Sequence, residues 1–268
     1  MGTNEIRFDE GAAYERYMGT WSQLAGEAFL DWLAPGAGLR WLEAGCGNGA
    51  FTELLVDRCA PASVRGIDPS EGQLAFARTR PASRIAQFHQ GDAMAVPFPE
   101  NTFDVAVMPL VIFFVPEPAK GVSEMARVVC PGGTVAAYAW DMDGGGFPYE
   151  ALHVEMRGLG VAVPRPPNPD ASRMEAMRDL WTGTGLDALE TREIRVQRTF
   201  ADFDDYWATV RVGPSVGPTL VGMPPEDIAL LKERMRARLP QDATGRITYG
   251  ARANAVKGLV PLEPQRWR

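Results

Sequence analysis

The sequence predicts an α/β fold, a doubly wound and mostly parallel sheet with helices on both faces. Two observations carry this prediction. Apolar segments of strand length alternate with helical segments between residues 39 and 140, and a glycine-rich turn follows the first strand in WLEAGCGNGA, residues 41–50. Strands and helices that alternate in this way are joined by right-handed crossovers, which place the strands parallel in one sheet. The 268 residues suffice for one large domain.

The first segment is predicted to be helical. Large apolar residues recur at helical spacing between Tyr14 and Leu33. We expect Gly19 and Thr20 to divide this segment into two helices, and Pro35-Gly36 to end the second one.

The core elements follow in order. Strands are expected at residues 39–43, 64–68, 85–93, 105–111 and 134–140. The helices between them are expected at 50–59, after residue 70 and from 118 to about 129. Ser70 and Gln73 form a predicted capping box, in which each side chain satisfies a free amide at the helix start. The PGG sequence at 131–133 is expected to turn into the fifth strand.

The regular alternation of predicted strands and helices ends after Asp143. Loops are expected at 144–146 and 164–170, and helices at 149–158 and 173–181. A strand at 188–200 and a last strand near 246–256 flank a helical insertion at about 201–240, which we expect to cap the active site.

Composition narrows the class of protein. The net charge of −7 and a pI near 5.0 argue against a nucleic-acid surface. The sequence has three widely spaced cysteines, Cys46, Cys59 and Cys130, and no C-x-x-C pair. We therefore expect neither a metal site nor a disulfide framework. The longest apolar run, residues 105–115, is too short to span a membrane, and the first residues lack the apolar core of a signal peptide. We therefore expect a cytoplasmic protein with no membrane span and no nucleic-acid partner.

The glycine turn predicts a nucleotide site, although turns of this kind also occur as plain loops. Gly45, Gly47 and Gly49 let backbone amides and a helix N-terminus approach a ligand. Asp68 ends the second strand, where an acid can bind both ribose hydroxyls. Asp92 ends the third strand, where a carboxylate can accept a hydrogen bond from an adenine amino group. We therefore predict a pocket for an adenosine-containing ligand at the carboxyl ends of the strands.

The glycine spacing discriminates between two such ligands. Nicotinamide enzymes use G-x-G-x-x-G, whereas this chain has G-x-G-x-G followed by Ala50. Glu43, two residues before Gly45, is unsuited to a pyrophosphate but suits a cationic amino-acid tail. These features favour S-adenosylmethionine.

The segments WLEAGCGNGAFT, GIDPSEGQLAFAR, QGDAMAVPFPENTFDVAV and EMARVVCPGGTVAAYAW resemble, in order, the motifs of class I S-adenosylmethionine-dependent methyltransferases. The resemblance covers about residues 40–141 and is closest to the type 11 group, which includes quinone-biosynthesis C-methyltransferases. It implies a Rossmann-like, seven-stranded sheet whose last strand is antiparallel. YERYMGTWS at 14–22 resembles the N-terminal lid of this group. The expected organisation is then one domain, with a lid at 1–36, a cofactor-binding core at 37–143, an acceptor-side half at 144–256 and a tail at 257–268.

The resemblance also implies roles for individual residues. Glu43 would bind the methionine ammonium, and Asp68 the ribose. The other expected cofactor contacts are Tyr14, Tyr17 and Trp21 in the lid, Gly45, Cys46 and Gly47 in the turn, Pro69, Ser70, Gln73, Asp92 and Ala93 around the adenine, and Met108 and Pro109 under the sulfonium.

The base is harder to predict. Many relatives carry a histidine pair after the fourth strand, where this chain has Phe113 and Phe114, so that role is not transferred. Asp141, which ends the fifth strand, and His153 are the candidate catalytic residues, each with a purely structural alternative.

Aromatic residues near the strand ends predict a partly apolar or aromatic acceptor: Phe113, Phe114, Tyr138, Trp140 and Trp207. Arg211 is expected to pair with an anionic group of the acceptor. The predicted function is methyl transfer to a small molecule by in-line displacement, in a monomer or homodimer. The alternatives are a non-catalytic S-adenosylmethionine-binding protein and a nicotinamide-dependent oxidoreductase.

Overall fold

The computed structural model describes residues 15–213 and 216–262. Within them a seven-stranded sheet has the order β3-β2-β1-β4-β5-β7-β6. Strand β7 is antiparallel to both of its neighbours, and the remaining pairs are parallel, which confirms the predicted sheet. The bounds of the strands are β1 Arg40–Ala44, β2 Ser63–Asp68, β3 Ala86–Gln90, β4 Phe103–Pro109, β5 Val129–Trp140, β6 Asp187–Phe200 and β7 Ile247–Leu259.

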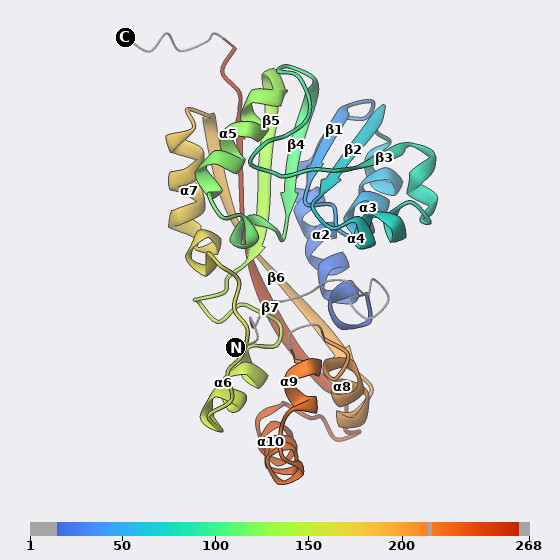
Figure 1. The fold of residues 1–268 in the computed structure, drawn as a ribbon, viewed down its shortest axis with the longest axis vertical. Coiled ribbons are helices and arrows are strands. Elements are labelled where there is room, and N and C mark those ends of the chain that lie inside the picture. The colour runs from blue at the N-terminus through green and yellow to red at the C-terminus, as the bar shows by residue number, and fades with distance from the viewer. Residues whose placement is uncertain (1–14, 214–215, 263–268) are drawn as a thin grey trace.

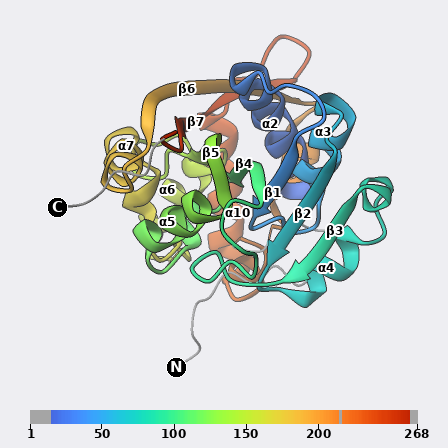
Figure 2. The same cartoon turned by 90° about the horizontal axis from the view of Figure 1, so that it is seen from above.

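Helices cover both faces of the sheet (Figure 2). Helices α2 (Thr20–Leu33) and α3 (Ala50–Cys59) pack together on one face, and α5 (Pro118–Val128) and α7 (Met174–Gly183) on the other. Helix α4 (Glu71–Ala77) packs on β2 and β3. Helix α5 shows why these segments are helical, because its buried residues Val122, Met125 and Val128 recur every three residues and Pro118 occupies its first turn.

A boundary between two helices lies at Gly19 and Thr20 as predicted, but it is a change of helix type with no break between them. A π-helical turn, η1 (Glu15–Gly19), runs directly into α2, and Gly19 has helical angles of φ −51° and ψ −52°. The glycine provides space instead of a turn, since a Cβ there would lie 3.0 Å from Glu15 Oε1.

Strand β5 begins earlier than predicted. Residues 131–133 belong to it, and the register between β4 and β5 shifts at this point. Gly132 has a φ of +79°, and a Cβ on Gly133 would lie 2.6 Å from Asp104 O. The two glycines therefore permit an irregular strand instead of a turn before one.

The last two strands form a long ribbon that extends past the other strands (Figure 1). The predicted helical insertion lies between them as α8 (Phe203–Val210), α9 (Gly217–Val221) and α10 (Pro225–Arg238). Helix α6 (Glu150–Gly158) packs on α10 at this end of the molecule. Three short 3-10 helices complete the described elements: η2 Pro81–Arg84, η3 Ile112–Phe114 and η4 Pro169–Ser172.

Candidate functional site

A cavity of about 260 Å³ lies at the carboxyl ends of β1, β2 and β4. Ligands bind at this edge in open α/β sheets. The cavity brings together eleven residues that the sequence predicted: Glu43, Gly45, Cys46, Gly47, Asp68, Pro69, Ser70, Gln73, Pro109, Phe114 and Tyr138. It also includes six that the sequence analysis missed: Ser22, Asn48, Ala50, Phe51, Leu110 and Val111.

The Asp68 carboxylate holds the glycine turn against the end of β2. Gly47 N donates to Asp68 Oδ2 and Ser70 N donates to Asp68 Oδ1, both at 2.9 Å. Of the predicted capping box, the Ser70 half is present, because Ser70 Oγ accepts from Gln73 N at 3.4 Å. Each carboxylate oxygen keeps a second lone pair for a ligand hydroxyl. Burial raises the pKa of Asp68.

Two glycines shape the turn. Gly45 has a φ of +80°, and a Cβ there would lie 2.4 Å from Val111 Cγ2. Gly47 has a φ of +50°, and its Cβ would meet no atom within 4 Å. Because Gly47 lines the cavity, this open space is where a ligand can approach the backbone.

Glu43 supplies a buried acid to the cavity. Its side chain is 1% exposed, and Thr52 Oγ1 donates to Glu43 Oε2 at 2.6 Å. Burial raises the pKa of Glu43 to about 8, although the hydrogen bond from Thr52 acts in the opposite direction. A cation bound beside this carboxyl would favour its ionised form. The donors and acceptors of the cavity thus fit an adenosine-containing ligand with a cationic tail.

The other side of the cavity is apolar. Leu110, Val111, Phe114 and Tyr138 line it from the ends of β4 and β5. Leu110 has a φ of +60°, which is uncommon for a bulky residue, and its amide donates to Tyr138 O at 2.7 Å. This backbone turn directs the chain after β4 along the rim of the cavity.

The lid aromatics lie elsewhere than expected. Tyr17 stacks on Tyr149 with ring centroids 4.2 Å apart, and Trp21 Nε1 donates to Tyr149 Oη at 3.2 Å. Trp21 also packs against Tyr249 of β7. The two residues join the start of α2 to the β6–β7 ribbon and are not among the cavity lining. Tyr14 lies outside the described residues.

Three further predicted cofactor contacts are absent from the lining. The Asp92 carboxylate is exposed and accepts from Met94 N at 2.8 Å, closing the turn after β3. Ala93 belongs to this turn, and Met108 is fully buried within β4. Their contacts with a ligand stay predictions.

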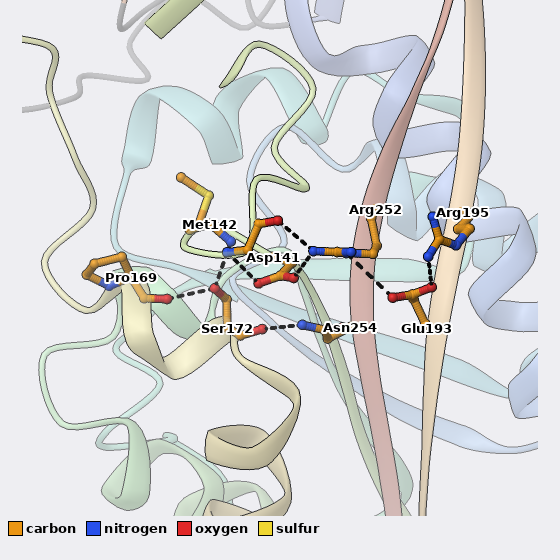
Figure 3. A network of polar contacts seen from close by, with 9 residues as sticks. Asp141, Met142, Pro169, Ser172, Glu193, Arg195, Arg252 and Asn254 are labelled. Atoms are coloured by element: carbon orange, nitrogen blue, oxygen red, sulfur yellow. Dashed lines mark hydrogen bonds and ion pairs between the residues drawn. The ribbon is translucent and has the colours of Figure 1, made fainter. Parts of the chain in front are cut away.

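Asp141 is engaged in a network between strands (Figure 3). Arg252 Nη2 of β7 donates to Asp141 Oδ2 at 2.5 Å, and Gly144 N donates to Asp141 Oδ1 at 3.0 Å. Arg252 also pairs with Glu193 of β6 at 3.5 Å. A carboxylate held by these partners is poorly placed to accept a proton from a substrate.

His153 lies in α6 and is buried, stacked on Phe147 at 5.1 Å between ring centroids. Burial lowers the pKa of His153 to about 4, so the ring is neutral near pH 7. His153 is not among the residues that line the cavity.

The predicted acceptor residues are dispersed. Phe114 and Tyr138 line the cavity, whereas Phe113, Trp140 and Trp207 are buried in the core. Arg211 is exposed. One cation that lies beside aromatic residues is Arg198 of β6, 4.3 Å from the Phe200 ring centroid and 3.3 Å from Tyr17 O. Its contacts with Tyr17 and Tyr149 could not be predicted from the sequence, because both residues lie far from Arg198 along the chain.

The described part of the chain contains no cluster of three histidine, cysteine or acidic side chains that could hold a metal ion. Among its helices none is both long and apolar enough to cross a bilayer.

Comparison with known proteins agrees with this geometry. Residues 42–137 match the family model described as a methyltransferase domain. The ubiquinone/menaquinone biosynthesis C-methyltransferase of Roseobacter denitrificans is 38% identical over 112 residues, which are 40% of this chain and 44% of that protein. The phosphatidylethanolamine N-methyltransferase of Cereibacter sphaeroides is 41% identical over 102 residues, 37% of this chain and 49% of that one.

A fatty-acid O-methyltransferase of Mycolicibacterium smegmatis is 35% identical over 96 residues, 36% of this chain and 35% of that protein. The chain thus spans less than half the length of each of these relatives. Relatives named for methylation at carbon, nitrogen and oxygen share the same core, so the matched segment does not determine which atom is methylated.

Solved structures share the fold at low identity. The YcgJ protein of Bacillus subtilis has a TM-score of 0.59 at 15% identity, covering 88% of this chain and 98% of that one. A phosphoethanolamine N-methyltransferase of Haemonchus contortus, solved with S-adenosyl-L-methionine, has a TM-score of 0.59 at 19% identity, covering 93% and 56%. The [4+2]-cyclase SpnF has a TM-score of 0.53 at 18% identity, covering 90% and 81%.

These structural likenesses show the fold alone. The family match confirms the resemblance that the sequence motifs carry, over residues 42–137, which match the methyltransferase-domain model.

Proposed function

We propose that this chain is an S-adenosylmethionine-dependent methyltransferase that acts on a small, partly apolar molecule. The observation that carries the proposal is the convergence of three features at one cavity. These are the turn around Gly47, the acid Asp68 at the end of β2 and the buried acid Glu43. A nicotinamide oxidoreductase, the other adenosine-site enzyme, is disfavoured by Glu43 and by the glycine spacing.

The bound cofactor would supply a methyl group already activated by its sulfonium. What the chain must add is alignment and exclusion of water. Asp68 would accept the ribose hydroxyls, Glu43 would balance the methionine ammonium, and the backbone at Gly47 would make room for the chain between them. Pro69, Ser70 and Gln73 would flank the adenine.

The acceptor side is proposed to be apolar because Leu110, Val111, Phe114 and Tyr138 line it. The titratable side chains in the described lining are Glu43, Cys46, Asp68 and Tyr138. Burial raises the pKa of the Cys46 thiol well above its usual range, so it stays protonated. With both carboxylates assigned to the cofactor, this favours an acceptor that needs little help in losing a proton.

Relatives named for quinone, phosphatidylethanolamine and fatty-acid methylation support an acceptor with a large apolar part. Location in the cytoplasm and a monomeric or homodimeric state remain part of this proposal.

The test is transfer of an isotopically labelled methyl group from S-adenosylmethionine to a panel of hydroquinones, fatty acids and polar amines, followed by mass spectrometry. We expect labelled product from at least one apolar acceptor, and at least a tenfold loss of rate at subsaturating cofactor in Asp68→Asn. Methylation of polar amines alone would overturn the acceptor class. Cofactor binding with no transfer to any of the acceptors would favour the non-catalytic alternative.

A further inference from the structure

Arg80 lies behind the glycine turn, outside the lining of the cavity. Its guanidinium donates three hydrogen bonds of 2.7 Å: from Nε to Asn48 O, from Nη1 to Glu53 Oε2 and from Nη2 to Glu15 Oε2. The Arg80 side chain is 14% exposed, so solvent screens these contacts less than those of a surface ion pair.

The three acceptors belong to three different elements. Asn48 is part of the glycine turn, Glu53 of helix α3, and Glu15 of the π-helical turn that leads into α2. One side chain therefore joins the turn, the first core helix and the N-terminal helical segment.

Asn48 links this network to the cavity. Its side chain is buried, and its Nδ2 donates to Glu15 Oε2 at 3.0 Å while its Oδ1 accepts from Ala50 N at 3.1 Å. Asn48 and Ala50 line the cavity. Any shift of Glu15 is consequently transmitted to residues that a ligand would touch.

A second cavity, of about 240 Å³, confirms how close the network lies to the first. Glu15, Glu53 and Arg80 line it, and it shares Ser22, Ala50 and Phe51 with the cavity at the strand ends. The second cavity thus lies between the N-terminal segment and α3, and Arg80 forms charge-assisted hydrogen bonds to both of them.

The three acceptors require the geometry of a guanidinium group. Its fork can reach a carbonyl and two carboxylates in different directions, whereas a lysine ammonium is a point charge on a flexible stem. Loss of Arg80 would also leave Glu15 and Glu53 as neighbouring anions without a counter-charge, and like charges at this distance repel.

We propose that Arg80 and Glu15 are positioning residues for the cofactor, which hold the glycine turn against the N-terminal segment and α3 and so set how fast the cofactor leaves. This inference rests on the proposed function. It assigns no contact with the cofactor to either residue, since both act through Asn48 and the start of α2.

The test measures dissociation of S-adenosylhomocysteine from the immobilised full-length chain. We expect Glu15→Gln to raise the dissociation rate about fivefold or more with little change in the melting temperature of the unliganded protein, because the Glu15 side chain is 44% exposed. Arg80→Gln should raise the dissociation rate at least tenfold. The dissociation rate of Arg80→Lys should lie between those of Arg80→Gln and the wild type.

Arg58→Gln is the matched control. Arg58 of α3 pairs with Asp31 of α2, so its loss removes an ion pair between α3 and the helix that follows the Glu15 segment, without touching the glycine turn. We expect its dissociation rate to equal that of the wild type.

The outcomes separate the two claims. A wild-type chain that does not bind S-adenosylhomocysteine contradicts the proposed function. If the wild type binds, and Glu15→Gln dissociates at the wild-type rate, the positioning role is wrong even when the Arg80 variants are unstable. Equal acceleration in Arg58→Gln would likewise overturn it, because the effect would then be one of general stability.

Discussion

The Glu43 carboxyl, which lies beside the proposed cation site, has an unusually high pKa. It is buried with one hydrogen-bond donor, Thr52, and burial raises its pKa to about 8. At neutral pH most of the unliganded protein therefore holds a proton there. An ammonium group would bind the ionised form, so binding should release that proton.

The affinity for S-adenosylhomocysteine should consequently rise with pH. Below about pH 8 ionisation of Glu43 is incomplete, and the dissociation constant should fall by up to about tenfold per pH unit until the pKa is passed. Glu43→Gln should bind more weakly at pH 8 and lose this dependence. Calorimetric titrations between about pH 6 and 9 measure both effects.

Thr52→Val gives a second test of whether Glu43 causes this pH dependence. The hydroxyl of Thr52 lowers the pKa of Glu43, so its removal should move the midpoint of the pH dependence upward. A wild-type affinity that does not change over this range would show that Glu43 does not contact the ligand ammonium.

Gly47 permits a second prediction, with Gly38 as its matched control. Both have positive φ, +50° and +76°, and a Cβ at either position meets no atom within 4 Å. Alanine at each should cost about 1 kcal/mol of stability from the left-handed backbone. Only Gly47 lines the cavity, so only Gly47→Ala should weaken S-adenosylhomocysteine binding, by tenfold or more. Equal affinities in the two variants would contradict the assigned site.

At the scale of elements, Arg252 joins the end of β5 to the middle of β6 and β7. It binds Asp141 Oδ2, Gly144 O at 2.6 Å and Glu193. Asp141→Asn and Arg252→Gln should each lower the free energy of unfolding by roughly 2 kcal/mol, because each leaves a partly buried partner unpaired. Their effects should be less than additive in the double variant.

Activity distinguishes this structural role from catalysis. The kcat of Asp141→Asn should stay within about threefold of the wild type at a temperature where both are folded. A loss of a hundredfold or more, absent in Arg252→Gln, would identify Asp141 as the general base after all.

The elements also show which sequence signals were sufficient. Helix α3 begins and ends as predicted, at Ala50 and Cys59, because its buried face lies between the glycine turn at Gly49 and the left-handed Ala60 that precedes Pro61. The glycines of η1 and β5 misled prediction. Gly19 is helical and makes space for Glu15, and Gly133 makes space for a neighbouring carbonyl, and neither requirement is visible in the local sequence.

For the whole molecule, the residues predicted well are those set by the topology of the sheet. Asp68 ends β2 and Glu43 is the penultimate residue of the adjacent parallel strand β1, so the fold alone brings them to one edge. Tyr17 and Trp21 were placed less well, because their surroundings depend on how the N-terminal segment packs on Tyr149 and on the β6–β7 ribbon. Arg80 was missed because its partners, Glu15, Asn48 and Glu53, are far apart in sequence.

The most direct test of the central claim is calorimetric titration of the full chain with S-adenosylmethionine, S-adenosylhomocysteine and NAD. We predict binding of both adenosyl sulfur ligands, no heat from NAD, and at least tenfold weaker binding in Asp68→Asn, with circular dichroism to verify that the variant is folded. Binding of NAD without either sulfur ligand would contradict the account, because the glycine turn and Glu43 would then serve a different cofactor.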